Sequence, residues 1–188
     1  MNEFIHIRMI IGFILSLTIA HLLRGVAKLI VHPTRSRPYW VHLVWGANVF
    51  LTIIDFWWWE YRLRQLTKWT FLSYMAVIIY VILFYFLCAL LFPEDLSDYK
   101  GFKDYYYARH TWLFGVLAAT FLMDVIDTSL KGADYINHLG TEYPINTVVH
   151  VLLCLIAIRV QNERFHAGLV IAMLVYNISW ISRHYFVE

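Results

Sequence analysis

Long apolar runs bounded by charged residues, proline or glycine dominate this chain. A bilayer hydrocarbon core about 30 Å thick is crossed by a helix of roughly 20 mostly apolar residues. Six runs approach or reach that length, which predicts spanning helices at residues 9–31, 39–59, 69–92, 111–130, 144–158 and 165–181. We therefore expect an all-α, polytopic membrane protein that forms a single transmembrane domain over residues 1–188.

The composition narrows the function classes. Of 188 residues, 61% are hydrophobic and 15% are charged, whereas a soluble domain is about half apolar and about a quarter charged. The net charge of +2 is small and scattered, which argues against a nucleic-acid partner. P-loop, dinucleotide, zinc-protease and nucleophile-elbow motifs do not occur. We expect no resident metal, and any function must reside in polar groups within the spans.

Basic and small residues recur along the first run. A basic stripe on one helix face is formed by His21, Arg24, Lys28 and His32. Gly12 precedes the first three of these by 9, 12 and 16 residues, and Gly115 precedes Asp124, Asp127 and Lys131 by the same intervals. Because two successive three-helix halves have opposite orientations, this similarity predicts a 3+3 inverted repeat of the kind found in transporters.

Four polar side chains share one predicted depth. At about 1.5 Å rise per residue, His21, Asn48 and His150 lie about 14 Å from the face that carries the first connection, and Asn177 lies within a turn of them. A polar group without a partner costs several kcal/mol in hydrocarbon, so we expect these side chains to converge near the bilayer centre.

Acidic and basic groups are sorted toward opposite leaflets. Asp55, Asp124 and Asp127 lie beyond about 20 Å on the same scale, whereas Arg24 and Lys28 lie within about 10 Å. The acidic group predicts a cation-attracting vestibule. The plainer interpretation is that Asp124 and Asp127 lie near the interface and pair with Lys131.

These features favour an ion- or proton-linked channel or small transporter. The residues of its pathway would be His21, Asn48, His150, Asn177, Asp124, Asp127 and Asp55, and a buried His can couple flux to pH. Its partners would be membrane lipid and a small ion or proton, and we expect a homo-oligomer.

Two other hypotheses fit the same residues. In the first, the protein is a b-type haem redox protein with His21 and His150 as axial ligands, and His42 and His110 as a further pair. In the second, it is a non-catalytic assembly or sensor subunit, in which Arg24 and Lys28 respond to voltage or to anionic lipid.

The charges of the loops and the aromatic runs predict how the chain is oriented and anchored in the membrane. Nine Lys and Arg residues flank the first, third and fifth connections and six flank the opposite face, which predicts both termini outside a bacterial inner membrane. The aromatic runs at residues 57–59 and 105–107 are predicted to anchor at the headgroups.

Overall fold

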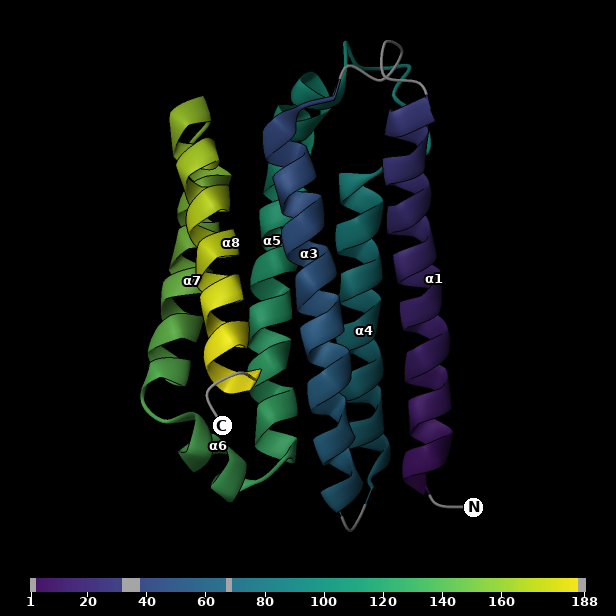
Figure 1. Ribbon diagram of the computed structural model, residues 1–188, viewed down its shortest axis with the longest axis vertical. Coiled ribbons are helices and arrows are strands. Elements are labelled where there is room, and N and C mark those ends of the chain that lie inside the picture. Colours follow the sequence, from purple (N-terminus) through teal and green to yellow (C-terminus); the bar gives the residue numbers. More distant parts are fainter. Residues whose placement is uncertain (1–2, 32–37, 67–68, 186–188) are drawn as a thin grey trace.

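The computed structural model describes residues 3–31, 38–66 and 69–185, and these residues form an all-helical bundle (Figure 1). The elements are α1 (Glu3–Val31), α3 (Trp40–Trp59), the 3-10 helix η1 (Glu60–Gln65), α4 (Phe71–Leu91), α5 (Phe102–Leu130), α6 (Ala133–Leu139), α7 (Glu142–Arg159) and α8 (Glu163–Tyr185). Within the described ranges, six helices are long and apolar enough to cross a membrane. The predicted six-span, all-α class is confirmed.

The helices pack in two layers. In the larger layer α1 packs on α4, α4 on α5, and α5 on α7; α3 and α8 pair with each other and lie over this row (Figure 1). We call the end of the bundle where α1 finishes the Val31 face, and the opposite end, where α1 begins and α8 finishes, the terminal face. α6 is a short helix at the terminal face.

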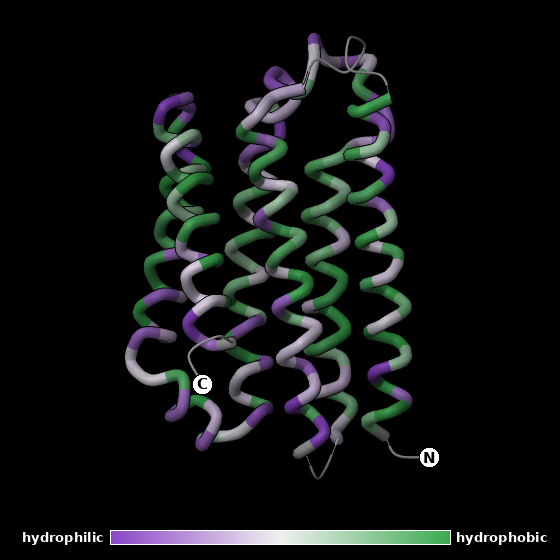
Figure 2. The backbone as a smooth tube through the Cα atoms, in the orientation of Figure 1, coloured by the Kyte–Doolittle hydropathy of each residue, from purple (hydrophilic) through white to green (hydrophobic). Residues whose placement is uncertain are grey.

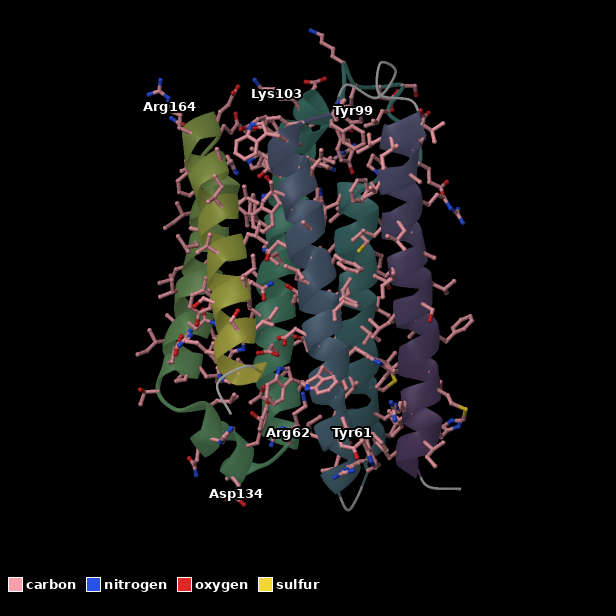
Figure 3. All side chains as sticks on the ribbon, viewed as in Figure 1. Tyr61, Arg62, Tyr99, Lys103, Asp134 and Arg164 are labelled. Atoms are coloured by element: carbon pink, nitrogen blue, oxygen red, sulfur yellow. The ribbon has the colours of Figure 1, made fainter. Side chains whose placement is uncertain are left out.

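The outer surface suits a lipid environment. Large apolar side chains such as Phe13, Leu72 and Val175 are exposed. Hydrophobic positions fill the middle of the helices and hydrophilic positions gather at the two ends (Figure 2). The labelled polar side chains in Figure 3 also lie at these ends, with Lys103 and Arg164 at the Val31 face and Asp134 at the terminal face. The structure thus indicates an integral, multi-pass membrane protein.

Local chemistry sets where α4 begins and ends. The Thr70 hydroxyl accepts a hydrogen bond from the Ser73 backbone N–H at 3.1 Å, and the Ser73 hydroxyl accepts one from the Thr70 N–H at 3.0 Å. This reciprocal cap satisfies N–H groups that the first helical turn leaves free. At the other end, Phe92 precedes Pro93 and leaves the helical region, because proline disfavours that conformation in the preceding residue.

Several predicted boundaries are wrong. α1 begins at Glu3 rather than at residue 9, and α5 begins at Phe102 rather than at residue 111. The aromatic run at 105–107 therefore belongs to a helix, and two of its members, Tyr105 and Tyr106, are buried in packing rather than anchored at headgroups. α6 was not predicted; it is set off by Gly132 and Gly140, whose φ values of 100° and 66° favour glycine.

The helix packing does not display the predicted inverted repeat. α1 packs mainly on α4, whereas its counterpart α5 packs mainly on α4 and α7. Gly115 is exposed, whereas Gly12 lies against the ring of Trp57. The equal spacings in the two halves therefore do not correspond to equal environments. The last member of the predicted basic stripe, His32, lies outside the described residues.

Candidate functional site

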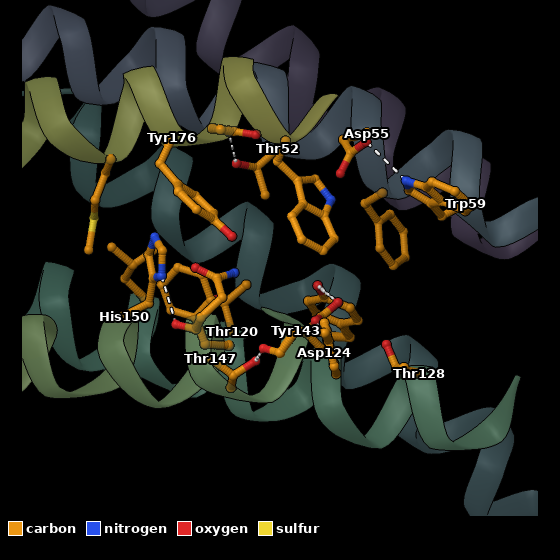
Figure 4. Close-up of a pocket in the computed structure, with 18 of the residues that line it drawn as sticks. Thr52, Asp55, Trp59, Thr120, Asp124, Thr128, Tyr143, Thr147, His150 and Tyr176 are labelled. Carbon is orange, nitrogen blue, oxygen red and sulfur yellow. Dashed lines mark hydrogen bonds between the residues drawn. The ribbon is translucent and has the colours of Figure 1, made fainter. Parts of the chain in front are cut away.

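A cavity of about 150 Å³ lies inside the bundle, between the α3 and α8 pair and the helices α5 and α7 (Figure 4). Thr52 and Asp55 line it from one side, and Thr120, Asp124 and Thr147 from the other. It extends from the middle of the helices to the terminal face, where α6 borders it. The cavity combines apolar walls with a few polar groups, as ligand sites in proteins do.

Asp124 is held in the cavity wall by two tyrosines. The Tyr80 hydroxyl donates to Oδ1 at 3.0 Å and the Tyr143 hydroxyl donates to Oδ2 at 2.9 Å. These phenols come from α4 and α7, so three helices meet at one carboxyl group. A carboxylate is an acceptor at both oxygens, and two O–H donors match that form. The arrangement presents an acidic side chain to the cavity.

Beside it, Lys131 joins two further carboxyl groups. Its Nζ lies 2.5 Å from Oδ2 of Asp127 and 3.0 Å from Oε1 of Glu60, and all three side chains are at most 6% exposed. Burial alone would lower the pKa of Lys131, but the Asp127 and Glu60 carboxylates outweigh that effect and hold the pKa above its usual range. Lys131 is therefore a fixed ammonium. The Asp127–Lys131 pairing considered from the sequence is present.

This acidic cluster is incompletely satisfied. Among the described residues, Oδ1 of Asp127 and Oε2 of Glu60 are buried without a hydrogen-bond partner. A buried polar atom without a partner costs about 1–3 kcal/mol, and more when it is charged. The cluster thus contains two carboxyl groups and a single ammonium to neutralise them.

Three of the four side chains predicted at mid-depth meet at the inner end of the cavity. The Asn177 amide donates to Oδ1 of Asn48 at 2.9 Å and to Oγ1 of Thr52 at 3.0 Å, which joins α8 to α3. His150 donates from Nδ1 to the Asn146 carbonyl at 2.8 Å and lines the cavity across from them. Asn48, His150 and Asn177 therefore share one site.

His21, the fourth, lies elsewhere. Its Nε2 donates to the Phe92 carbonyl at 2.8 Å, and its ring packs against Tyr85. The Lys28 ammonium donates to the Glu94 carbonyl at 2.7 Å, and Nε2 of His42 bonds the Leu91 carbonyl. These are carbonyls at and just beyond the end of α4, where helices leave acceptors unpaired and where cationic groups are favoured. His21 thus caps the end of α4 and is not among the residues that line the cavity.

The other predicted residues also divide between the cavity and α1. Arg24 is exposed on α1. Asp55 lines the cavity and accepts a hydrogen bond from Trp59 Nε1 at 3.1 Å. Of the predicted acidic group, Asp55 and Asp124 line the cavity and Asp127 lies beside it, paired with Lys131. The described members of the basic stripe lie on α1.

The structure does not assemble the predicted haem pairs. α1, which carries His21, and α7, which carries His150, lie on opposite sides of the bundle (Figure 1). His42 is engaged with α4, and Nδ1 of His110 bonds the Tyr107 carbonyl at 2.7 Å. The rings of Tyr106 and His166 lie between His42 and His110, because His42 packs near Tyr106 and His110 packs near His166.

A dry layer closes the cavity toward the Val31 face. About one turn beyond Asn48 and His150 lie four fully buried residues, namely Trp45, Phe114, Cys154 and Val170. The Trp45 and Phe114 rings meet edge to face with centroids 5.4 Å apart. Behind them Trp45 Nε1 donates to the Tyr106 hydroxyl at 3.2 Å, and that hydroxyl lies 3.0 Å from Nδ1 of His166. The residues of this layer come from α3, α5, α7 and α8.

Sequence reasoning missed several residues that build the site. Glu60 follows a tryptophan run at the end of a predicted span, and nothing in the sequence distinguishes it from an interfacial charge. Tyr80 and Tyr143 carry no periodic signal that separates them from membrane-anchoring aromatics. The sequence signal that did group Asp124, Asp127 and Lys131 was their spacing from Gly115, which equals the spacing of His21, Arg24 and Lys28 from Gly12.

No protein-family model, curated protein or solved structure matches this chain significantly.

Proposed function

We propose that this protein is a proton-linked transporter of small cations. The observation that carries the proposal is the excess of acid at and beside the cavity: Asp124 lines it, and Glu60 and Asp127 pair with the Lys131 ammonium, which also lines it. Unpaired negative charge is costly where the carboxyl groups are buried from water. A bound proton or a bound cation neutralises such a charge, so the two compete for the same carboxyl groups. Competition of this kind couples their movement.

The closed inner end favours a transporter over an open pore. The cavity reaches the terminal face, but the layer containing Trp45 and Phe114 separates it from the Val31 face. Transport through this bundle then requires the layer to open while the terminal end closes. α3 and α8 pack as a pair over the row of helices that includes α5, and their displacement as a unit would change access on both sides of the cavity.

Charge distribution supports an orientation. In the sequence, nine of the 15 Lys and Arg residues lie in or beside the first, third and fifth connections. By the positive-inside rule this favours the Val31 face in the cytoplasm and both termini outside, with the α6 end of the cavity toward the exterior. A helical multi-pass chain of this kind fits a bacterial inner membrane, because outer-membrane spanning proteins are typically β-barrels.

Proton flux in liposomes tests the proposal. Purified protein is reconstituted into vesicles that contain a pH-sensitive dye and an acidic interior, and sodium, potassium or choline chloride is added outside. We expect the interior to become alkaline faster than in empty vesicles with at least one of the three cations. Asp124→Asn should lower that rate by about tenfold, equivalent to about 1.4 kcal/mol.

Asp134→Asn is the matched control, because Asp134 is exposed on α6 at the terminal face (Figure 3). It should leave the rate unchanged. The proposal is wrong if none of the three cations drives protein-dependent proton movement, or if Asp124→Asn transports as fast as the unchanged protein.

A further inference from the structure

Aromatic rings surround the acidic groups of the cavity. Tyr80 and Tyr143, which hold Asp124, line it together with Phe56, Tyr176 and Trp180. The rings come from α3, α4, α7 and α8, so they enclose the space from several sides. A ring face is a region of negative potential, and rings near a carboxylate form a site that favours a positively charged guest.

The protein's own cations already use rings at the same end of the cavity. The Arg62 guanidinium carbon lies 5.0 Å from the Trp59 ring centroid and 4.9 Å from that of Tyr135. The Lys131 ammonium lies 5.8 Å from the Tyr135 centroid. All three distances are within the range in which cations are attracted to aromatic faces. Aromatic recognition of cations is thus part of how this region is built.

The size of the cavity limits the guest. An apolar protein cavity of about 150 Å³ accommodates a molecule such as benzene, with roughly six non-hydrogen atoms. The volume here is about the same. Divalent metals need several oxygen or nitrogen ligands at short range, and the described residues contain no group of three or more His, Cys, Asp or Glu side chains placed to hold one. The dimensions and lining match an organic cation better.

We propose that the cavity binds a small organic monocation, a quaternary ammonium or alkylamine about the size of benzene, with its charge near Asp124 and its carbon atoms against Tyr143 and Tyr80. This inference rests on the proposed transport function, since it names the cargo of the same cavity. The terminal face is the side from which the cation enters.

Equilibrium binding of choline to the purified full-length protein is the test, and it is independent of transport. Binding is followed by intrinsic tryptophan fluorescence and by calorimetry. The paired probe is 3,3-dimethyl-1-butanol, in which a carbon replaces the ammonium nitrogen, so that shape is kept and charge is removed. We expect choline to bind about tenfold more tightly than the neutral probe, as a charge-dependent aromatic site requires.

Two substitutions locate the site. Asp124→Asn should weaken choline binding by about tenfold and leave the neutral probe unaffected. Tyr143→Leu, which removes a cavity ring, should weaken choline binding to a similar extent. Tyr61→Leu is its control, since Tyr61 is exposed at the terminal face and contacts Arg64. The comparison of the two probes on the unchanged protein holds even where a variant does not fold.

The outcomes separate the two proposals. Equal affinity for choline and its neutral analogue, or no binding of choline, overturns the organic-cation inference. If proton flux with sodium or potassium persists in that case, the transport function stands with an inorganic ion as cargo. Choline binding without any cation-driven proton flux supports the binding site and contradicts the coupled transport.

Discussion

The Tyr143 hydroxyl donates a hydrogen bond to Oδ2 of Asp124 at 2.9 Å and joins α7 to α5 at the wall of the cavity. Tyr80 completes the arrangement from α4 at 3.0 Å. The two phenol donors hold the Asp124 carboxyl group in position. They also offset part of the cost of burying its charge. Asp124 is therefore the residue through which packing and proposed transport are most closely connected.

Tyr143→Phe removes one donor and keeps the ring. Hydrogen bonds to charged groups contribute about 1.5–3 kcal/mol, and we expect a loss of that size in the free energy of unfolding in detergent. Tyr74→Phe is the control, because the Tyr74 ring packs near Phe71 at the start of α4, away from Asp124. Equal stability of the two variants would show that the phenol does not support the carboxylate.

Lys131→Met leaves the Asp127 and Glu60 carboxyl groups without their ammonium. Loss of one partner of a buried pair costs about 3–5 kcal/mol, so the melting temperature should fall at neutral pH. The sign of the pH dependence follows from the raised pKa of Lys131. Its stabilising contribution is complete below the unfolded value of about 10.4 and declines only above it.

The stability difference between the unchanged protein and Lys131→Met should accordingly persist up to about pH 10 and shrink at higher pH. Thermal unfolding of both proteins across the alkaline range measures this. A difference that already disappears near neutral pH would mean that the ammonium is not held by its two carboxylates.

Gly25→Ala tests the packing of α1 against the end of α4. A Cβ at Gly25 would lie 2.4 Å from both Cβ and Cγ of Phe92, and the position of Cβ is fixed by the backbone. Overpacking of this kind costs about 1–3 kcal/mol. Gly115→Ala, where nothing lies within 4 Å, should be neutral or stabilising. Thermal unfolding of the two variants compares them directly, and similar melting temperatures would contradict the close contact.

Substitution of His21 tests whether this residue caps the end of α4 or belongs to the transport pathway. His21→Leu leaves the Phe92 carbonyl without its donor, and we expect a loss of about 1–3 kcal/mol in stability. His21→Gln keeps an amide donor and should retain both stability and cation-driven proton flux. A large loss of flux in His21→Gln at unchanged stability would restore the pathway role expected from the sequence.

Predictions from the sequence succeeded where they depend only on the length and the rise of a helix. Run length predicted six spans because the bilayer sets that length. Depth arithmetic placed Asn48, His150 and Asn177 together because the rise per residue is constant. The same arithmetic failed for His21, since depth does not say which neighbour a helix face meets. Which helices pair is decided by side-chain packing over the whole bundle, as in the contact of α1 with α4.

Residues at span ends were the hardest to interpret. Glu60 and Lys131 look like interfacial charges in sequence, but η1 and the turn before α6 direct them inward to one another. The start of α5 was missed because Lys103 and Arg109 interrupt the apolar run, although buried Tyr105 and Tyr106 continue the helix. Such groups are placed by tertiary contacts that hydropathy does not record.

Proton release on cation binding tests the central claim most directly. Sodium, potassium or choline chloride is added to purified protein in weakly buffered detergent solution that contains a pH indicator. If protons and cations compete for the carboxyl groups around Lys131, one of these salts should release up to about one proton per chain, and Asp124→Asn should release far less. No release with any of the three cations, or equal release from Asp124→Asn, would contradict the account.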